Sequence, residues 1–102
     1  DTKVFIGENV TIGHLAHVHG ATIHNNVLIG STSTILDNAI IHSSNLIAAG
    51  ATVSPRTIIE SGHLVVGLPA SIKRPLKQSE IDHIVWNAEE YVKLKDEYIK
   101  EK

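Results

Sequence analysis

The sequence predicts an all-β solenoid, a parallel β-helix built from six-residue repeats, followed by one C-terminal α-helix. The first observation is an aliphatic residue at every sixth position, with one residue lost between the third and fourth members of the series. The series is Ile6, Ile12, Val18, Ile23, Ile29, Ile35, Ile41, Ile47, Val53, Ile59 and Val65. The second is a small or branched residue four places after most of them. Neither a helix, with period 3.6, nor an ordinary strand, with period 2, produces this pattern.

Three repeats close one triangular coil, so residues eighteen apart stack in neighbouring coils at about 4.8 Å. The aliphatic residue points inward, and the small residue fits beneath the corner, with Asn45 and His63 as exceptions. Glycine and asparagine supply the backbone conformations that corners require. The segment 6–70 has room for roughly three and a half coils. A β-sandwich of short strands would need turns every 8–12 residues and period-two alternation, and it is disfavoured.

The repeats end near Leu68-Pro69-Ala70, and the third observation is a helical pattern beyond them. Apolar residues then recur at helical spacing, at Ile81, Ile84, Val85, Ala88, Tyr91, Val92 and Tyr98. Ser79 is the expected N-cap, with Glu80 and Asp82 in the first turn. We therefore assign residues 1–74 to the β-helix, 75–78 to a hinge and 79–101 to a helix that packs alongside one face of the prism.

Composition restricts the class of protein further. The 102 residues suit one domain, and 42% hydrophobic content is enough for a small core. A net charge of −2 without a basic run argues against nucleic acid or an anionic membrane as the main partner. The chain has no cysteine, no apolar segment of membrane-spanning length and no visible signal peptide, and we predict a cytoplasmic location. Because the pattern is already under way at Asp1, we expect further coils before it.

Three of the seven histidines fall within six positions, at His14, His17 and His19. His14 stands two places after an inward residue and His19 one place after another, so both point outward, from different faces of the prism. One chain cannot easily bring them onto one ion. Two chains packed side by side could, and closed three-fold symmetry would repeat the site at each interface. Without cysteine ligands, zinc held by imidazole is the leading choice.

Residues 11–23 (TIGHLAHVHGATI) resemble the metal-site segment of γ-class carbonic anhydrases, with two histidines five apart between glycines and the same one-residue shortening. Residues 27–30, 35–39, 65–70, 74–76 and 87–92 are similar to further markers of that family, although Lys77 replaces a usual capping serine. The resemblance implies a left-handed β-helix, a homotrimer, and zinc-dependent hydration of carbon dioxide to bicarbonate, with Fe²⁺ or Co²⁺ as alternative metals.

The resemblance also implies roles for individual residues. His14 and His19 match the second and third zinc ligands, contributed by different subunits, and the family's first ligand histidine lies upstream of Asp1. Tyr91 matches a family tyrosine near the pocket, where it is a candidate catalytic residue, and packing on the prism face is the alternative role.

Other interpretations remain open. A hexapeptide acyltransferase uses the same prism with a histidine base and a CoA thioester, but it more often carries a long loop between coils. A trimeric scaffold without activity is the third. His24 and His42 are one coil apart and should stack, with Glu60 next in the column, and a second metal site there is a remote alternative. His63 and His83 suggest no chemistry. His17 is favoured as an exposed surface histidine, and the alternative is that it supports a metal ligand or substitutes for one.

Overall fold

The computed structural model describes residues 3–101, and within the C-terminal helix it describes side chains as far as Tyr91 and that of Lys93. The predicted apolar positions Val92 and Tyr98 lie outside the described side chains. The twelve strands and the helix follow in chain order: β1 (Phe5–Ile6), β2 (Thr11–Ile12), β3 (His17–Val18), β4 (Thr22–Ile23), β5 (Leu28–Ile29), β6 (Thr34–Ile35), β7 (Ile40–Ile41), β8 (Leu46–Ile47), β9 (Thr52–Val53), β10 (Ile58–Ile59), β11 (His63–Gly67), β12 (Ala70–Pro75) and α1 (Gln78–Glu101).

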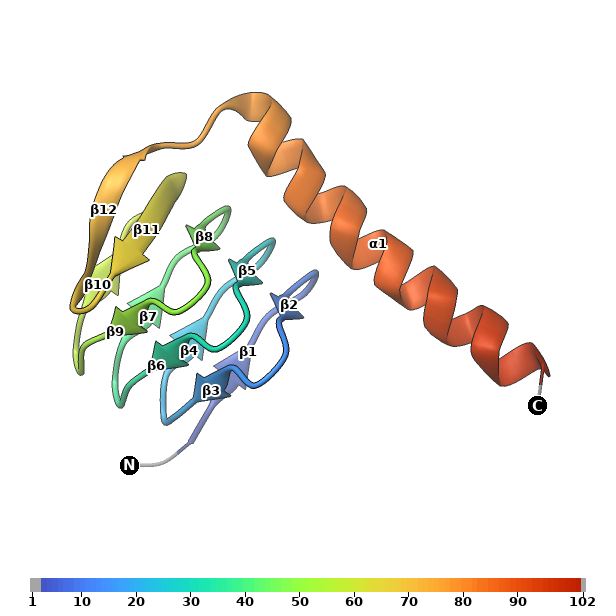
Figure 1. Ribbon diagram of the computed structural model, residues 1–102, viewed down its shortest axis with the longest axis horizontal. Coiled ribbons are helices and arrows are strands. Elements are labelled where there is room, and N and C mark those ends of the chain that lie inside the picture. Colours follow the sequence, from blue (N-terminus) through green and yellow to red (C-terminus); the bar gives the residue numbers. More distant parts are fainter. Residues whose placement is uncertain (1–2, 102) are drawn as a thin grey trace.

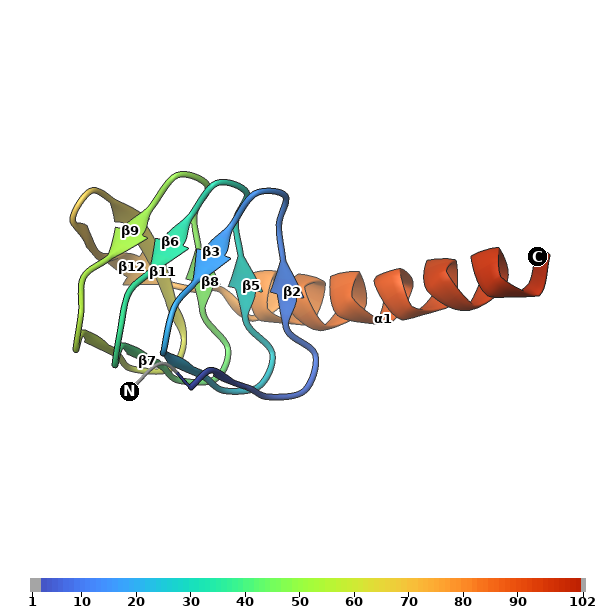
Figure 2. The ribbon, with the colours of Figure 1, turned by 90° about the horizontal axis from the view of Figure 1, so that it is seen from below.

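The strands form the three faces of a solenoid of about three turns, as the six-residue period predicted (Figures 1 and 2). Within each face, the strands of successive coils pair in parallel. Sheet A has the order β1-β4-β7-β10, sheet B the order β12-β11-β8-β5-β2, and sheet C the order β3-β6-β9. Ile6 pairs with Ile23, and Ile23 pairs with Ile41. The register therefore advances by seventeen residues from the first coil to the second and by eighteen from the second to the third, which confirms the single lost residue.

The inward aliphatic residues fill the prism. Ile29, Ile35, Ile41, Ile47 and Val53 are completely buried. Asn45, one of the two exceptions to the pattern of small residues at the corners, is also buried. Its side chain is satisfied by hydrogen bonds. Its Nδ2 donates to the carbonyl of His42, and its Oδ1 accepts from the backbone N–H of His63. Buried polar groups paired in this way avoid the cost of desolvation.

Left-handed backbone conformations recur at the corners with the same period of six. They fall at Asn9, Leu15, Asn26, Thr32, Asn38, Ser44, Gly50, Arg56 and Gly62. Asparagine and glycine were expected at such corners, but leucine, threonine, serine and arginine were not, because a Cβ atom disfavours a positive φ. The corner after β3 has no left-handed residue. It is the place where the repeat loses one residue, so a tighter connection replaces the usual turn.

The C-terminal end differs from the prediction in two respects. After Gly67 the chain reverses, and β12 runs antiparallel to β11, so residues 70–75 close the solenoid as a hairpin and do not extend the repeat. The helix begins at Gln78, and the prediction of Ser79 as its N-cap is wrong. The carbonyl of Lys77 accepts the N–H of Ile81, and the N–H of Lys77 donates to Oε1 of Glu80, which is one half of a capping box. Lys77 therefore caps the helix through its backbone.

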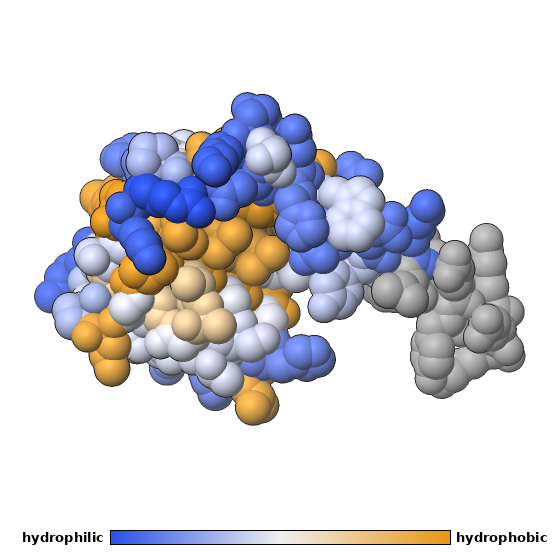
Figure 3. Space-filling view, turned by 45° about the horizontal axis from the view of Figure 1, so that its top comes forward, coloured by the Kyte–Doolittle hydropathy of each residue, from blue (hydrophilic) through white to orange (hydrophobic). Residues whose placement is uncertain are grey.

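Helix α1 packs on sheet B. Ile84 is completely buried and Ala88 nearly so, whereas Trp86 on another side of the helix is half exposed. Hydrophobic side chains lie on the coils beside the start of α1, and the visible surface of the helix is mainly hydrophilic (Figure 3). In the part of the chain that the structure describes, no helix combines the length and apolar character needed to cross a membrane.

Candidate functional site

His14 lies at the corner between sheets B and C, two residues beyond the end of β2, and its side chain is exposed. The glycine before it is required by close packing between coils. A Cβ atom on Gly13 would lie 2.6 Å from the backbone nitrogen of Ser31. The carbonyl of His14 accepts the N–H of Thr32 at 2.9 Å, which ties this corner to the next coil. The backbone of His14 is thus fixed while its imidazole faces outward.

His19 lies just beyond the other end of β3, where the shortened corner begins, and it is also exposed. Its N–H donates to the carbonyl of Ile35 at 2.9 Å, and its carbonyl accepts the N–H of Ala21. Gly20 is buried, and its N–H donates to Oδ1 of Asp37 at 3.0 Å. Asp37 therefore holds the tight turn that follows His19.

Sequence reasoning assigned Asp37 no role of its own and missed this one. The role could have been inferred from the position of Asp37 in the sequence. It lies seventeen residues after Gly20, which is one coil away across the shortened corner.

The two candidate ligands flank β3, the outermost strand of sheet C, and His17 is the exposed first residue of that strand. Among residues 3–101, no group of three or more His, Cys, Asp or Glu side chains is placed to hold a metal ion. Within the described residues, no hydrogen bond involves a ring nitrogen of His14 or His19. Each chain therefore offers two accessible imidazoles of the kind zinc prefers, one fewer than the usual three protein ligands of a catalytic zinc.

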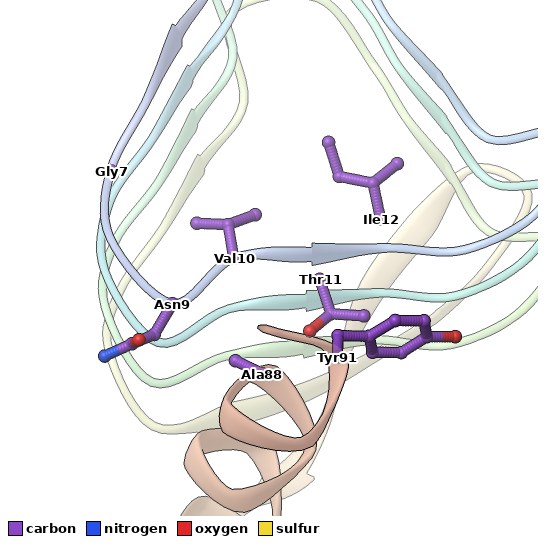
Figure 4. Close-up of a pocket in the computed structure, with 7 residues that line it drawn as sticks. All are labelled: Gly7, Asn9, Val10, Thr11, Ile12, Ala88 and Tyr91. Carbon is purple, nitrogen blue, oxygen red and sulfur yellow. The ribbon is translucent and has the colours of Figure 1, made fainter. Parts of the chain in front are cut away.

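Tyr91 lies on α1 against the outer side of β2, next to Thr11, while Val10 and Ile12 point to the inside of the coil (Figure 4). These residues line a hollow of about 350 Å³ together with Gly7, Asn9 and Ala88. The Tyr91 ring is 55% exposed, and its hydroxyl points toward the end of β2 that leads to His14 (Figure 4). Beneath it, the buried Oγ1 of Thr11 has no hydrogen-bond partner in the described structure.

The remaining histidines are separate from this corner. The rings of His24 and His42 are stacked, with centroids 5.0 Å apart and planes within 3°, as their spacing predicted. His63 Nδ1 is 2.9 Å from the carbonyl oxygen of Glu60, and His83 stacks on Trp86 with centroids 5.5 Å apart. The structure therefore gives His63 and His83 local contacts and leaves His14 and His19, on either side of β3, as the candidate site.

Comparison with known proteins supports this reading of the fold. The family model for the bacterial transferase hexapeptide, six repeats, matches residues 3–37 and 20–55. Protein YrdA of Escherichia coli is 47% identical over 94 residues, which cover 92% of this chain and 51% of YrdA. A protein of Methanocaldococcus jannaschii named "Probable carbonic anhydrase" is 53% identical over 91 residues, covering 89% of this chain and 57% of that protein.

A solved structure of a "putative acetyltransferase" from Bacillus cereus superposes with a TM-score of 0.89 at 28% identity, covering 97% of this chain and 63% of that chain. The chain thus spans about half the length of the curated relatives it matches. Repeat, coil geometry and relatives agree, and the chain belongs to the hexapeptide-repeat β-helix family related to YrdA and the γ-carbonic anhydrases.

Proposed function

We propose that this chain forms a zinc-dependent, γ-carbonic anhydrase-like site that hydrates carbon dioxide, with each metal ion shared between neighbouring subunits of a homotrimer. The observation that carries the proposal is the placement of His14 and His19 at opposite ends of the outermost strand β3, both exposed. Side chains so arranged suit ligation of two ions at two interfaces better than of one ion within one chain. The relative named as a carbonic anhydrase supports the choice of reaction.

The chain's own residues supply three things to such a site. His14 and His19 would hold the metal, with a further ligand from outside the described residues. Zinc bound by imidazoles lowers the pKa of a water molecule to about 7, which provides a nucleophile at neutral pH. Asp37 keeps the turn after His19 closed, and Tyr91 offers a hydroxyl along β2 that can hold or pass a proton.

Leu15 supports the placement of a neighbouring subunit at this corner. Its side chain is 79% exposed, and its φ is 58°. A leucine here carries both the cost of exposing apolar surface and the cost of a left-handed backbone, and asparagine would avoid both. A contact that covers Leu15 in the assembled protein would offset these costs. Since Leu15 directly follows His14, that contact would lie beside the metal.

The test is metal content by plasma mass spectrometry on protein whose mass is determined by light scattering. We expect about one zinc or iron per chain in a trimer, reduced to background by His14→Ala and by His19→Ala. His17→Ala is the matched control, because it removes an exposed imidazole from the same strand and should keep the metal. A metal-free trimer would overturn the proposal and favour a scaffold role, whereas equal loss in all three variants would show only that the corner had unfolded.

Acyl transfer is the second candidate, and one observation favours it. The superposable Bacillus cereus structure is that of a protein named "putative acetyltransferase". Against it, the corners between the described coils are short, so no loop extends over the prism to hold an acceptor. Acetyl-CoA hydrolysis or transfer by metal-free protein, lost in His19→Ala, would favour this candidate over hydration.

A further inference from the structure

One column of residues on the corner between sheets A and B remains unexplained by the site at β3. The strand registers align Gly7, His24, His42 and Glu60, one residue from each successive coil. The rings of His24 and His42 lie face to face, with centroids 5.0 Å apart and planes inclined by 3°. Both residues follow an inward isoleucine, so both imidazoles point away from the prism.

The backbone holds these two imidazoles at a fixed separation. The N–H of His24 donates to the carbonyl of Ile41, and the N–H of His42 donates to the carbonyl of Ile59, each at 2.9 Å. The side chains are not restrained in the same way. Within residues 3–101, no hydrogen bond engages a ring nitrogen of either histidine, in contrast to His63, whose Nδ1 contacts a carbonyl. Two imidazoles with available lone pairs therefore project side by side from a rigid support.

The space beside His24 is open. The preceding residue of the column is Gly7, and a Cβ atom there would lie 2.3 Å from Oδ1 of Asn25, so this position cannot easily carry a side chain. The surface next to the ring forms a shallow hollow, lined by Phe5, Ile6, Gly7, Thr22, Ile23, His24 and Asn25. His24 is exposed and His42 is partly exposed. The rings have room to tilt and to admit water or a small ligand beside them.

We propose that His24 and His42 form a second binding site, a two-imidazole site for a divalent transition-metal ion. Metal–nitrogen bonds of about 2.0–2.1 Å require the two ligand nitrogens to lie about 3–4 Å apart. Side-chain rotation that tilts two rings stacked at 5.0 Å can bring one nitrogen of each to that separation. The donor set is imidazole without thiolate, which ranks Cu²⁺ above Ni²⁺ and Zn²⁺. Water completes the coordination, and the bound ion links the second coil to the third.

The site is independent of the proposed catalytic metal. His24 and His42 lie on the corner between sheets A and B, whereas His14 and His19 flank the edge strand of sheet C. Two ligands from adjacent coils of one chain also complete this site without a second subunit. An ion that binds only the folded state raises the midpoint of thermal unfolding as its concentration rises. Metal at the column should therefore protect even a monomeric protein.

The test uses Cu²⁺ and Ni²⁺ as probes on the full chain. Substoichiometric Ni²⁺ should broaden the imidazole proton resonances of His24 and His42 together, and both should broaden further as the Ni²⁺ concentration rises. Cu²⁺ affinity, measured by calorimetry in the His14→Ala/His19→Ala background, should fall about tenfold or more in both His24→Gln and His42→Gln. His83→Gln, which removes an exposed imidazole from α1, should leave it unchanged.

Two results would overturn the proposal. One is Cu²⁺ affinity that stays within experimental error in both His24→Gln and His42→Gln. The other is nickel broadening of His24 and His42 no stronger than that of His83. Because the background lacks His14 and His19, the Cu²⁺ affinity measured there does not depend on the proposed catalytic metal, and the two proposals can fail separately.

Discussion

The last coil of the solenoid is closed by a hairpin, whereas the first coil, although α1 packs on β2, leaves strand edges and apolar side chains exposed. At the C-terminal end, β12 pairs with β11, and Ala70 packs against the core. At the N-terminal end, β1, β2 and β3 are each the outermost strand of their sheet, and Phe5 and Ile6 are 61% and 48% exposed. The candidate ligands His14 and His19 both lie on this first coil, and the completely buried core positions lie in the coils behind it.

The largest expected effect comes from removing core volume in the third coil, compared with the same change in the first. Ile47→Ala empties a completely buried position, and we expect it to lower the free energy of unfolding by about 3–4 kcal/mol. Ile12→Ala makes the same change at a position that is 40% exposed, and we expect a loss of about 1 kcal/mol. Urea unfolding followed by circular dichroism measures both. Equal losses would show that the first coil is as well covered in solution as the third.

A smaller effect is expected at the shortened corner after His19. Asp37→Ala leaves the buried N–H of Gly20 without its acceptor, which should cost about 1–2 kcal/mol and accelerate amide exchange at Gly20. Asp37→Asn retains a side-chain oxygen at the same place and should preserve most of the protection. If both variants exchange at the wild-type rate, Asp37 does not hold the turn, and its assigned role in positioning His19 is wrong.

A substitution at Leu15 should change folding stability and trimer assembly in opposite directions. Leu15→Asn places a residue that tolerates a positive φ at an exposed left-handed position, and we expect unfolding free energy to rise by about 1 kcal/mol. Under the proposed function, the same variant should lose trimer and metal. Ser44→Asn is the control at another corner, where Asn26 already occupies the equivalent place one coil earlier. It should be stabilised without loss of trimer. A trimeric, metal-loaded Leu15→Asn protein would remove Leu15 from the interface.

The six-residue period predicted the coils, their registers and the stacked pair His24–His42, because inward residues repeat wherever one coil lies on another. It did not predict β12, because the chain reverses there. Ile72 lies opposite Val65 on an antiparallel strand, seven residues later, and the six-residue period does not apply to such a pair. The period also did not predict the positive φ angles of Leu15 and Arg56. Closure of the coil sets these angles, against the intrinsic preference of both residues. For the candidate site, sequence identified the histidines, but Asp37 required the register across the shortened corner. The trimer, the metal and the cytoplasmic location remain predictions.

The smallest effect is expected at the junction that anchors the covered end. Arg74 donates from both terminal nitrogens to the carboxylate of Glu80, at 2.8 and 2.9 Å, and the N–H of Lys77 adds a third donor. The hydrogen bonds from Arg74, and then that from Lys77, lower the pKa of Glu80 from its ordinary 4.5 to about 2. Because the folded-state pKa is the lower one, the carboxylate stabilises the fold fully above pH 4.5, and this contribution is lost as the pH falls toward 2.

Comparison of wild type with Glu80→Gln across this pH range tests the junction. The difference in unfolding midpoint should be constant above pH 5 and shrink steadily below pH 4.5, and it should be modest because both side chains are partly exposed to screening by water. Trp86, two turns into α1, reports the helix start by fluorescence. Glu60→Gln removes a carboxylate other than the one to which Arg74 donates, and it should not reproduce the pH-dependent difference. A Glu80→Gln protein whose helix start melts with the wild-type pH profile would mean that α1 is held by the packing of Ile84 and Ala88 alone. The covered end would then owe its closure to apolar contact and not to the ion pair.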